Sequence, residues 1–167
     1  MTCATTFRRA CLADADAVIG LVQRRIEWMD ACGLHQWNET DYFGRYPRTY
    51  WEENIGSFLV GLREGRVVVA MALYTSDIRW GKMSDEAYYL HHLVSDIEAK
   101  GAGAELMLFA ERYAVKHGVA VLRLDSAVGN GRLEEFYTRL GYVACGLCHD
   151  RLYHGVLREK MLAAPEV

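Results

Sequence analysis

An apolar run, a glycine-rich loop, an amphipathic stretch and a second apolar run follow one another between residues 87 and 127. The amphipathic stretch, residues 104–118, places Leu106, Phe109, Ala110 and Tyr113 on one face at helical spacing and ends at a glycine. The apolar runs on either side, "AYYLHHLV" and "VAVLRLDSA", have the composition of strands. A strand, a helix and a strand joined this closely form a right-handed crossover between parallel strands.

The remaining pattern predicts an α/β fold, a central mixed twisted sheet flanked by helices. We expect a strand in "TTFRRAC", a helix capped by Asp14 or Asp16, a short helix over residues 48–54 and a hairpin over residues 57–74. A further helix over residues 131–140 precedes a second hairpin. With two prolines and no linker-like tract, residues 1–167 are predicted to form a single domain.

Charge and composition exclude several classes of protein. A net charge of -3 with no block of like charges gives no reason to expect nucleic acid as a partner. The first residues lack the apolar core of a secretory signal, and no stretch is apolar enough to span a membrane. We therefore expect a cytoplasmic protein.

The five cysteines are expected to be reduced thiols, because the number is odd and no export signal is present. Cys145, Cys148 and His149 spell the C-x-x-C-H pattern of haem attachment. They lie, however, within two extended runs around a His-Asp turn, and no second C-x-x-C completes a zinc site. Neither haem nor a metal is expected.

The loop "EAKGAGAELM" contains Gly101 and Gly103 just before the predicted helix. A loop that enters a helix N-terminus presents unpaired amides to an anion, and glycines let the backbone approach that anion. Alternatively, the loop binds no ligand and contains small residues only because its turn requires flexibility. A dinucleotide fingerprint fits poorly, because Leu106 stands where a third small residue is required and too few residues follow Asp125 for further strand–helix units.

Two segments resemble the GNAT (GCN5-related N-acetyltransferase) family over about residues 86–146. "LHHLVSDIEAKGAGAELMLFAERYAVKHG" is similar to its acetyl-CoA motif, and "LRLDSAVGNGRLEEFYTRLGY" to its second motif. The resemblance implies an N-acetyltransferase that moves an acetyl group from acetyl-CoA to a primary amine of a small molecule or peptide, by direct attack in a ternary complex. It also makes a homodimer possible. The alternative is a non-catalytic acyl-CoA-binding sensor domain.

The resemblance also implies the cofactor contacts. The backbone of Leu93 and Val94 would pair with the pantetheine arm, and the pyrophosphate would rest on the amides of the loop, contributed by Ala99, Lys100, Gly101, Ala102, Gly103 and Ala104. Asn130 would contact the cofactor arm, cap the following helix, or both. Glu98 stands where the family has Arg or Gln; a carboxylate is unfavourable beside a pyrophosphate, so Glu98 is expected to point away, or the loop to align with a one-residue gap.

Tyr137 matches the family's tyrosine that protonates the departing thiolate; it could instead be a buried aromatic. A base is needed for an ammonium acceptor. His91 and His92 are predicted to lie on opposite faces of one strand. We choose His92, with His91, Asp125, Glu27 or water alone as alternatives. Two interpretations remain for the aromatic segment before residue 47. It could form a pocket for the acceptor amine, or its aromatic side chains could fill the core beneath a loop. The residues concerned are Trp37, Tyr42, Phe43 and Tyr46, with Glu39 and Asp41.

Overall fold

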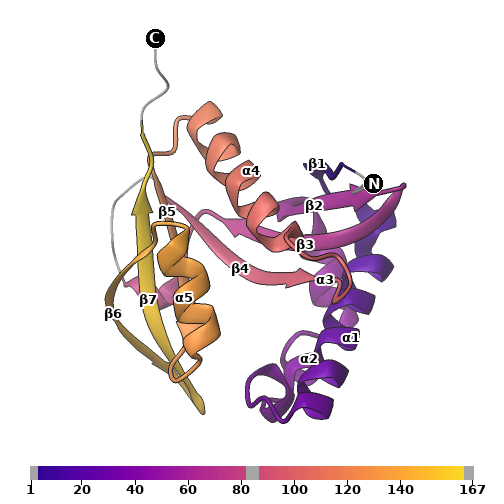
Figure 1. Ribbon diagram of the computed structural model, residues 1–167, viewed down its shortest axis with the longest axis horizontal. Helices are drawn as coiled ribbons and strands as arrows, with labels where there is room; N and C mark the ends of the chain where they lie inside the picture. The colour runs from indigo at the N-terminus through magenta and orange to yellow at the C-terminus, as the bar shows by residue number, and fades with distance from the viewer. Residues whose placement is uncertain (1–3, 82–86, 164–167) are drawn as a thin grey trace. The chain divides into compact units, whose positions relative to one another are not determined.

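Strands and helices follow one another as the hydrophobic pattern predicts (Figure 1). The computed structural model describes residues 4–81 and 87–163. Its elements are β1 (Thr6–Arg9), α1 (Ala15–Cys32), α2 (Tyr42–Arg45), α3 (Arg48–Asn54), β2 (Phe58–Arg63), β3 (Arg66–Tyr74), β4 (Ala87–Ser95), α4 (Ala102–Lys116), β5 (Val121–Ala127), α5 (Gly131–Arg139), β6 (Val143–Asp150) and β7 (Tyr153–Met161). A 3₁₀ turn, η4 (Ile78–Trp80), follows β3.

The strands form one mixed sheet in the order β1-β2-β3-β4-β5-β7-β6, which confirms the predicted α/β class. β4 and β5 are parallel, as the strand–helix–strand pattern predicts, with Ala87 to Tyr89 opposite Val121 to Arg123. β1 with β2, β2 with β3, β5 with β7 and β6 with β7 are antiparallel. The β2–β3 turn consists of Glu64 and Gly65, both with positive φ, which is the conformation of a tight hairpin turn.

The described residues form two compact units. The first comprises the chain up to Ala72 together with His92–Met107. Helix α1 contacts α3 in this unit. Its fully buried side chains come from one face of α1, from α3, β2, β3 and the start of α4, because apolar residues at helical spacing turn one face inward. They include Val18, Val22, Trp51, Phe58, Met71 and Leu106.

The second unit comprises Leu73–His91 and Leu108–Val167, as far as these ranges are described. Trp80, Ala87, Tyr89 and Val121 form a buried cluster in it, with Tyr74 and Leu157 packed against the cluster. The expectation of a single domain over residues 1–167 stays a prediction.

Four local expectations differ from the structure. Helix α2 lies in a segment expected to be irregular, and α4 begins at Ala102 rather than at residue 104. The last hairpin turns at Arg151 and Leu152, since Arg151 has a φ of 54°, and not at His149 and Asp150, which belong to β6. Asp14 stands at the N-cap of α1, yet its carboxylate accepts from Arg8 and from the Cys11 amide rather than from the helix.

Candidate functional site: a glycine loop, a buried tyrosine and an acidic pocket

Asp96 organises the loop between β4 and α4. Its amide donates to the Val68 carbonyl at 2.7 Å, and its own carbonyl accepts from the Ala99 amide at 3.1 Å. Its carboxylate accepts from the Glu98 amide at 3.0 Å. These bonds hold the loop without a ligand, and the Glu98 side chain is exposed to solvent.

The amides of the loop divide into two sets. Lys100 donates to the Glu98 carbonyl at 3.0 Å and Ala102 donates to the Ala99 carbonyl at 3.1 Å, so these groups are already satisfied. For the amides of Gly101, Gly103 and Ala104, the described part of the chain provides no acceptor. These three amides lie at the N-terminus of α4, where the helix dipole also favours an anion.

Gly101 has a φ of 82°, in the left-handed region that favours glycine. The backbone conformation therefore explains why a glycine occupies this position. Glu105, in the first turn of α4, lies between Thr5, which donates to it, and Arg63 at 3.4 Å. Arg63 also donates to the Lys100 carbonyl at 3.3 Å. The positive charge of Arg63 therefore offsets the one carboxylate that the helix carries near its open amides.

In the second unit, two site residues expected from the second motif, Asn130 and Tyr137, lie at the start of α5 and within it. Asn130 is the N-cap of α5 and accepts from the Leu133 amide at 3.1 Å, so its capping role is confirmed. Tyr137 is buried, with its ring edge-on to Phe136 and Tyr142. Burial, and after it the negative charge of Asp125, raise the pKa of the Tyr137 phenol above its usual value. The phenol is therefore protonated at every physiological pH.

His92 lies in the aromatic core of the first unit. Tyr42 and Tyr50 place their hydroxyls on its two ring nitrogens, Tyr50 at 2.9 Å, and the rings of Trp51 and Phe58 pack around it. It has a φ of 55°, an irregularity within β4. The structure therefore assigns His92 at least a structural role, because both of its nitrogens are engaged.

The segment expected to form the acceptor pocket serves two purposes. Trp37 stacks on Tyr42 at 4.8 Å between ring centroids, and Tyr46 packs on Tyr42 and His92. Tyr42 is buried in the core, and the partly exposed Trp37 and Tyr46 pack against it. Asp41 caps α2 by accepting from Gly44, and Glu39 pairs with His35. These contacts satisfy the two carboxylates locally.

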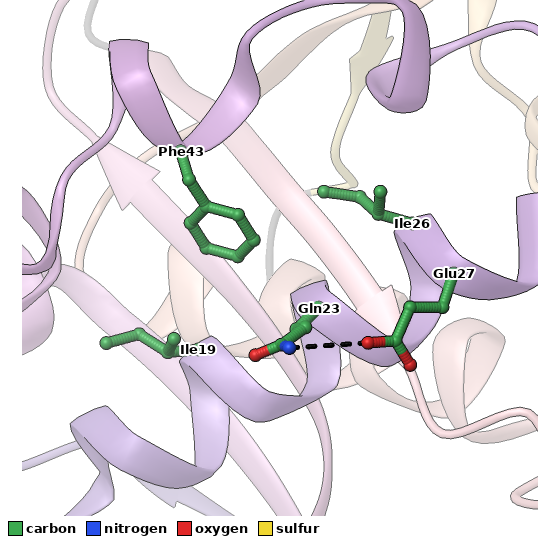
Figure 2. Close-up of a pocket in the computed structure, with 5 residues that line it drawn as sticks. All are labelled: Ile19, Gln23, Ile26, Glu27 and Phe43. Atoms are coloured by element: carbon green, nitrogen blue, oxygen red, sulfur yellow. Dashed lines mark hydrogen bonds between the residues drawn. The ribbon is translucent and has the colours of Figure 1, made fainter. Parts of the chain in front are cut away.

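Phe43 lines a pocket of about 410 Å³. Figure 2 shows its ring, carried by α2, pointing toward Ile19, Gln23 and Ile26 on α1. Glu27 completes the lining, and Gln23 donates to its carboxylate at 3.3 Å. The four α1 residues follow the spacing i, i+4, i+7, i+8 and so share one helix face. Sequence reasoning named Phe43 and Glu27 but missed this helical face, which the spacing could have revealed.

A second group of charges, in the second unit, surrounds Asp125. Arg79 bridges Asp125 and Asp150, each at 3.1 Å, and the Tyr153 hydroxyl donates to Asp125 at 2.6 Å. Asp77 lies 2.8 Å from Nε2 of His91. Acceptor atoms of Asp77, His91 and Asp125 lie within 4.8 Å of one another. Such a group could hold a cation, but Arg79 already supplies a positive charge there; the expectation of no metal stays a prediction.

No disulfide joins the four cysteines that the structure describes, Cys11, Cys32, Cys145 and Cys148, and Cys3 lies outside the described residues. Cys148 is distant from Asp125 in sequence, but the two residues interact electrostatically in the folded unit. Burial, then the charge of Asp125, raise the pKa of the Cys148 thiol. A thiol held protonated is a poor nucleophile.

None of the helices in the described ranges has the length and apolar character that a membrane span requires.

Comparisons with known proteins agree with this arrangement. Residues 21–142 match the model of the Acetyltransferase (GNAT) family. The uncharacterized N-acetyltransferase YesJ of Bacillus subtilis (strain 168) is 24% identical over 152 residues, which cover 82% of this chain and 81% of YesJ.

Two solved structures illustrate the shared fold. A GNAT family acetyltransferase from Streptococcus agalactiae 2603 superposes with a TM-score of 0.78 at 18% identity, covering 95% of this chain and 96% of that one. The PaiA N-acetyltransferase from Thermoplasma acidophilum, solved in complex with coenzyme A, has a TM-score of 0.75 at 18% identity, covering 95% and 99%. Because the family model spans well over half of its length, the chain belongs to the GNAT acetyltransferase family.

Proposed function

We propose that the protein transfers an acetyl group from acetyl-CoA to the primary amine of a small molecule or peptide, by direct attack in a ternary complex. Family membership supports acetyl transfer. The observation that carries the proposal is a set of three amides at the start of α4, those of Gly101, Gly103 and Ala104, for which residues 4–81 and 87–163 offer no acceptor. Such a set matches the charge and shape of a pyrophosphate.

The residues around the open amides fit the cofactor. The small side chains of Ala99, Ala102 and Ala104 leave room for a ligand beside the loop backbone. The exposed Lys100 adds a positive charge. In this proposal Leu93 and Val94 pair with the pantetheine arm through their backbone, and Asn130 contacts the arm while it caps α5. β4 pairs with β5 through Ala87 to Tyr89 and continues to Ser95, which supports this role. Bound acetyl-CoA would supply the activated acyl group as a thioester.

Tyr137 is proposed as the acid that protonates the departing thiolate. Its raised pKa keeps the phenol protonated until the carbon–sulfur bond breaks. The protonated Cys148 thiol supports direct transfer over an acyl-cysteine intermediate.

The pocket between α1 and α2 supports an amine as the acceptor. Its lining is apolar at Ile19, Ile26 and Phe43, whereas Glu27 is a carboxylate for which the described residues provide no cationic partner. An ammonium group on an apolar stem would complement both properties. The base that this acceptor requires is proposed on β4, which carries His92 and His91. The homodimer stays a prediction.

The first experiment is thermal unfolding of the protein with acetyl-CoA, CoA or NADH added separately. A ligand at 100 times its Kd stabilises the folded state by about 2.7 kcal/mol. The proposal expects stabilisation by both CoA species and none by NADH; no response to either CoA species would reject it.

The variant Tyr137→Phe then separates an enzyme from a sensor. For an enzyme, turnover of a responsive amine falls by about 10²- to 10⁴-fold while the CoA-induced shift in Tm is retained. CoA binding without turnover of any amine in the wild-type protein would instead favour the acyl-CoA-binding sensor.

A further inference from the structure

The pocket between α1 and α2 combines apolar surface with one carboxylate. Ile19 and Ile26 on α1 and Phe43 on α2 supply the apolar surface, whereas Gln23 and Glu27 supply the polar atoms (Figure 2). From Ile19 to Glu27 the helix advances about 12 Å, or about 1.5 Å per residue. An extended chain could therefore lie along α1 with one end at the carboxylate.

The arginines that precede Glu27 in the sequence bind other groups. Arg24 lies 3.8 Å from the carboxylate of Asp96, and Arg25 donates to the carbonyl at the end of β4 at 2.6 Å. The Gln23 amide donates to Glu27 at 3.3 Å, but it carries no charge. In the described part of the chain, Glu27 therefore has no cationic partner, and its charge is available to a ligand.

Gln23 provides a second acceptor beside this carboxylate. Its Nε2 donates to Glu27, so its Oε1 faces away from Glu27, toward Ile19 in Figure 2. A cation between α1 and Phe43 can thus donate to a charged oxygen and to a neutral one. Both polar side chains are exposed, so the interaction is that of a partly hydrated ion pair.

A carboxylate in the acceptor pocket is of little use to the amine that reacts. The nitrogen that attacks a thioester must be neutral, since its lone pair forms the new bond. A carboxylate against this nitrogen would favour its charged form and so oppose the attack. Glu27 is suited instead to a second cation, at the other end of the same molecule.

The wall of the pocket that α2 forms is attached to the strand proposed to bind the pantetheine arm. Tyr42, next to Phe43, is buried, and its hydroxyl is hydrogen-bonded to Nδ1 of His92. His92 precedes Leu93 on β4. The pocket, this end of β4 and the glycine loop all belong to the first unit. One unit therefore carries both the pocket and the proposed contacts to the cofactor.

We propose that the acceptor is an aliphatic primary amine with a second positive charge, and that Glu27 is the residue that selects for this charge. The inference rests on the proposed function and names its substrate class. The ammonium that does not react binds Glu27 and Gln23. The aliphatic chain lies against the apolar side chains of the pocket, and the amine at its other end is acetylated.

The test uses three compounds with the same chain length: hexamethylenediamine, hexylamine and ε-aminocaproate. The end opposite the reacting amine is a cation, uncharged or an anion, respectively. With saturating acetyl-CoA, kcat/KM of the wild-type protein should be about fivefold to fiftyfold higher for the diamine than for hexylamine, and lowest for ε-aminocaproate. Because the ion pair is exposed, this preference should shrink at about 1 M salt.

Glu27→Gln and Glu27→Lys are compared with the control Glu53→Gln in the full chain. Glu53 is an exposed carboxylate of α3 in the same unit and is not part of the pocket lining. Glu27→Gln should raise KM for the diamine by about fivefold to fiftyfold at nearly constant kcat, because the contact is remote from the reacting atoms. Its KM for hexylamine should not change. Glu27→Lys should prefer ε-aminocaproate to the diamine, and Glu53→Gln should behave as the wild type.

Calorimetric titration of hexamethylenediamine into the CoA-saturated protein gives a readout that needs no turnover. The Kd of the diamine should rise in Glu27→Gln by the same factor as KM. The CoA-induced shift in Tm should stay at the wild-type value in every variant, which shows that the variants are folded and that the cofactor site is intact.

The outcomes separate the two proposals. A wild-type protein that neither binds CoA nor acetylates any of the three amines would reject the proposed function, and the dicationic acceptor with it. Equal kcat/KM for hexamethylenediamine and hexylamine, or CoA binding without any binding of the diamine, would reject the dicationic acceptor alone. A fall in kcat of Glu27→Gln that is equal for all three amines would place Glu27 in the transfer step and overturn its role in selection. A diamine preference that persists in Glu27→Lys would overturn that role as well.

Discussion

Replacing Gly101 by alanine tests the glycine loop with the fewest other changes. The backbone there has a φ of 82°, and a residue with a Cβ in the left-handed region costs about 1–2 kcal/mol. The atom nearest to an added Cβ is a carboxylate oxygen of Glu105 at 3.9 Å, an ordinary contact, so the cost is conformational rather than steric. For a chain of this size it corresponds to a fall in Tm of roughly 2–8 °C.

Gly118→Ala provides the matched control at the opposite end of α4. It has a φ of 76° and open space around the added Cβ, so a similar loss of stability is expected. Only Gly101→Ala should weaken CoA binding, because relief of its strain turns the amides of Gly103 and Ala104 away from the ligand. The loss of one hydrogen bond to a charged group, about 1.5–3 kcal/mol, raises Kd by about tenfold to a hundredfold.

Thermal unfolding and calorimetric titration with CoA measure the two effects separately. The reasoning is refuted if Gly101→Ala and Gly118→Ala lose the same stability and bind CoA equally well. It is refuted also if Gly118→Ala weakens binding as much as Gly101→Ala, since the effect would then follow helix stability and not the loop.

Three further predictions concern stability. Trp51→Ala removes a fully buried indole and should lower the free energy of unfolding by about 3–5 kcal/mol in urea titrations; a loss below 1 kcal/mol would contradict its place in the core. Asn130→Ala removes the cap on the Leu133 amide and should cost about 1 kcal/mol by the same measurement, whereas an unchanged midpoint would show that the cap contributes nothing. Arg8, followed by the Cys11 amide, lowers the pKa of Asp14 from 3.8 to about 2, so its contribution is present above pH 4 and is lost as the pH falls toward 2. Acid unfolding of Asp14→Asn should lack this component, and an acid transition equal to that of the wild type would contradict the pairing.

Much of the fold follows from local patterns. The parallel pair β4 and β5 was predictable because two apolar runs flank an amphipathic helix. The side-chain cap expected for α1 was wrong because Asp14 has a partner that the pattern does not reveal. Asp14 reads as a helix cap, but Arg8 on β1 binds its carboxylate.

The candidate site was predictable only where it is local. The glycine loop is contiguous, so its residues could be named from spacing alone. The group around Asp125 is assembled from η4, β4, β5, β6 and β7, and nothing in the sequence near Asp77 or Arg79 indicates that they meet His91 and Asp125. The aromatic segment was ambiguous because Tyr42 and Phe43, adjacent in sequence, serve the core and the pocket respectively.

The bonds that Asp96 makes within the loop have a consequence for the thermodynamics of ligand capture. Since the loop is held by its own amides and carbonyls, little backbone disorder would be lost when an anion docks, and the association need not wait for a rearrangement. Binding should therefore be fast and single-phased in stopped-flow experiments. Asp96→Ala should slow it or add a second phase, because the loop would then have to order around its ligand.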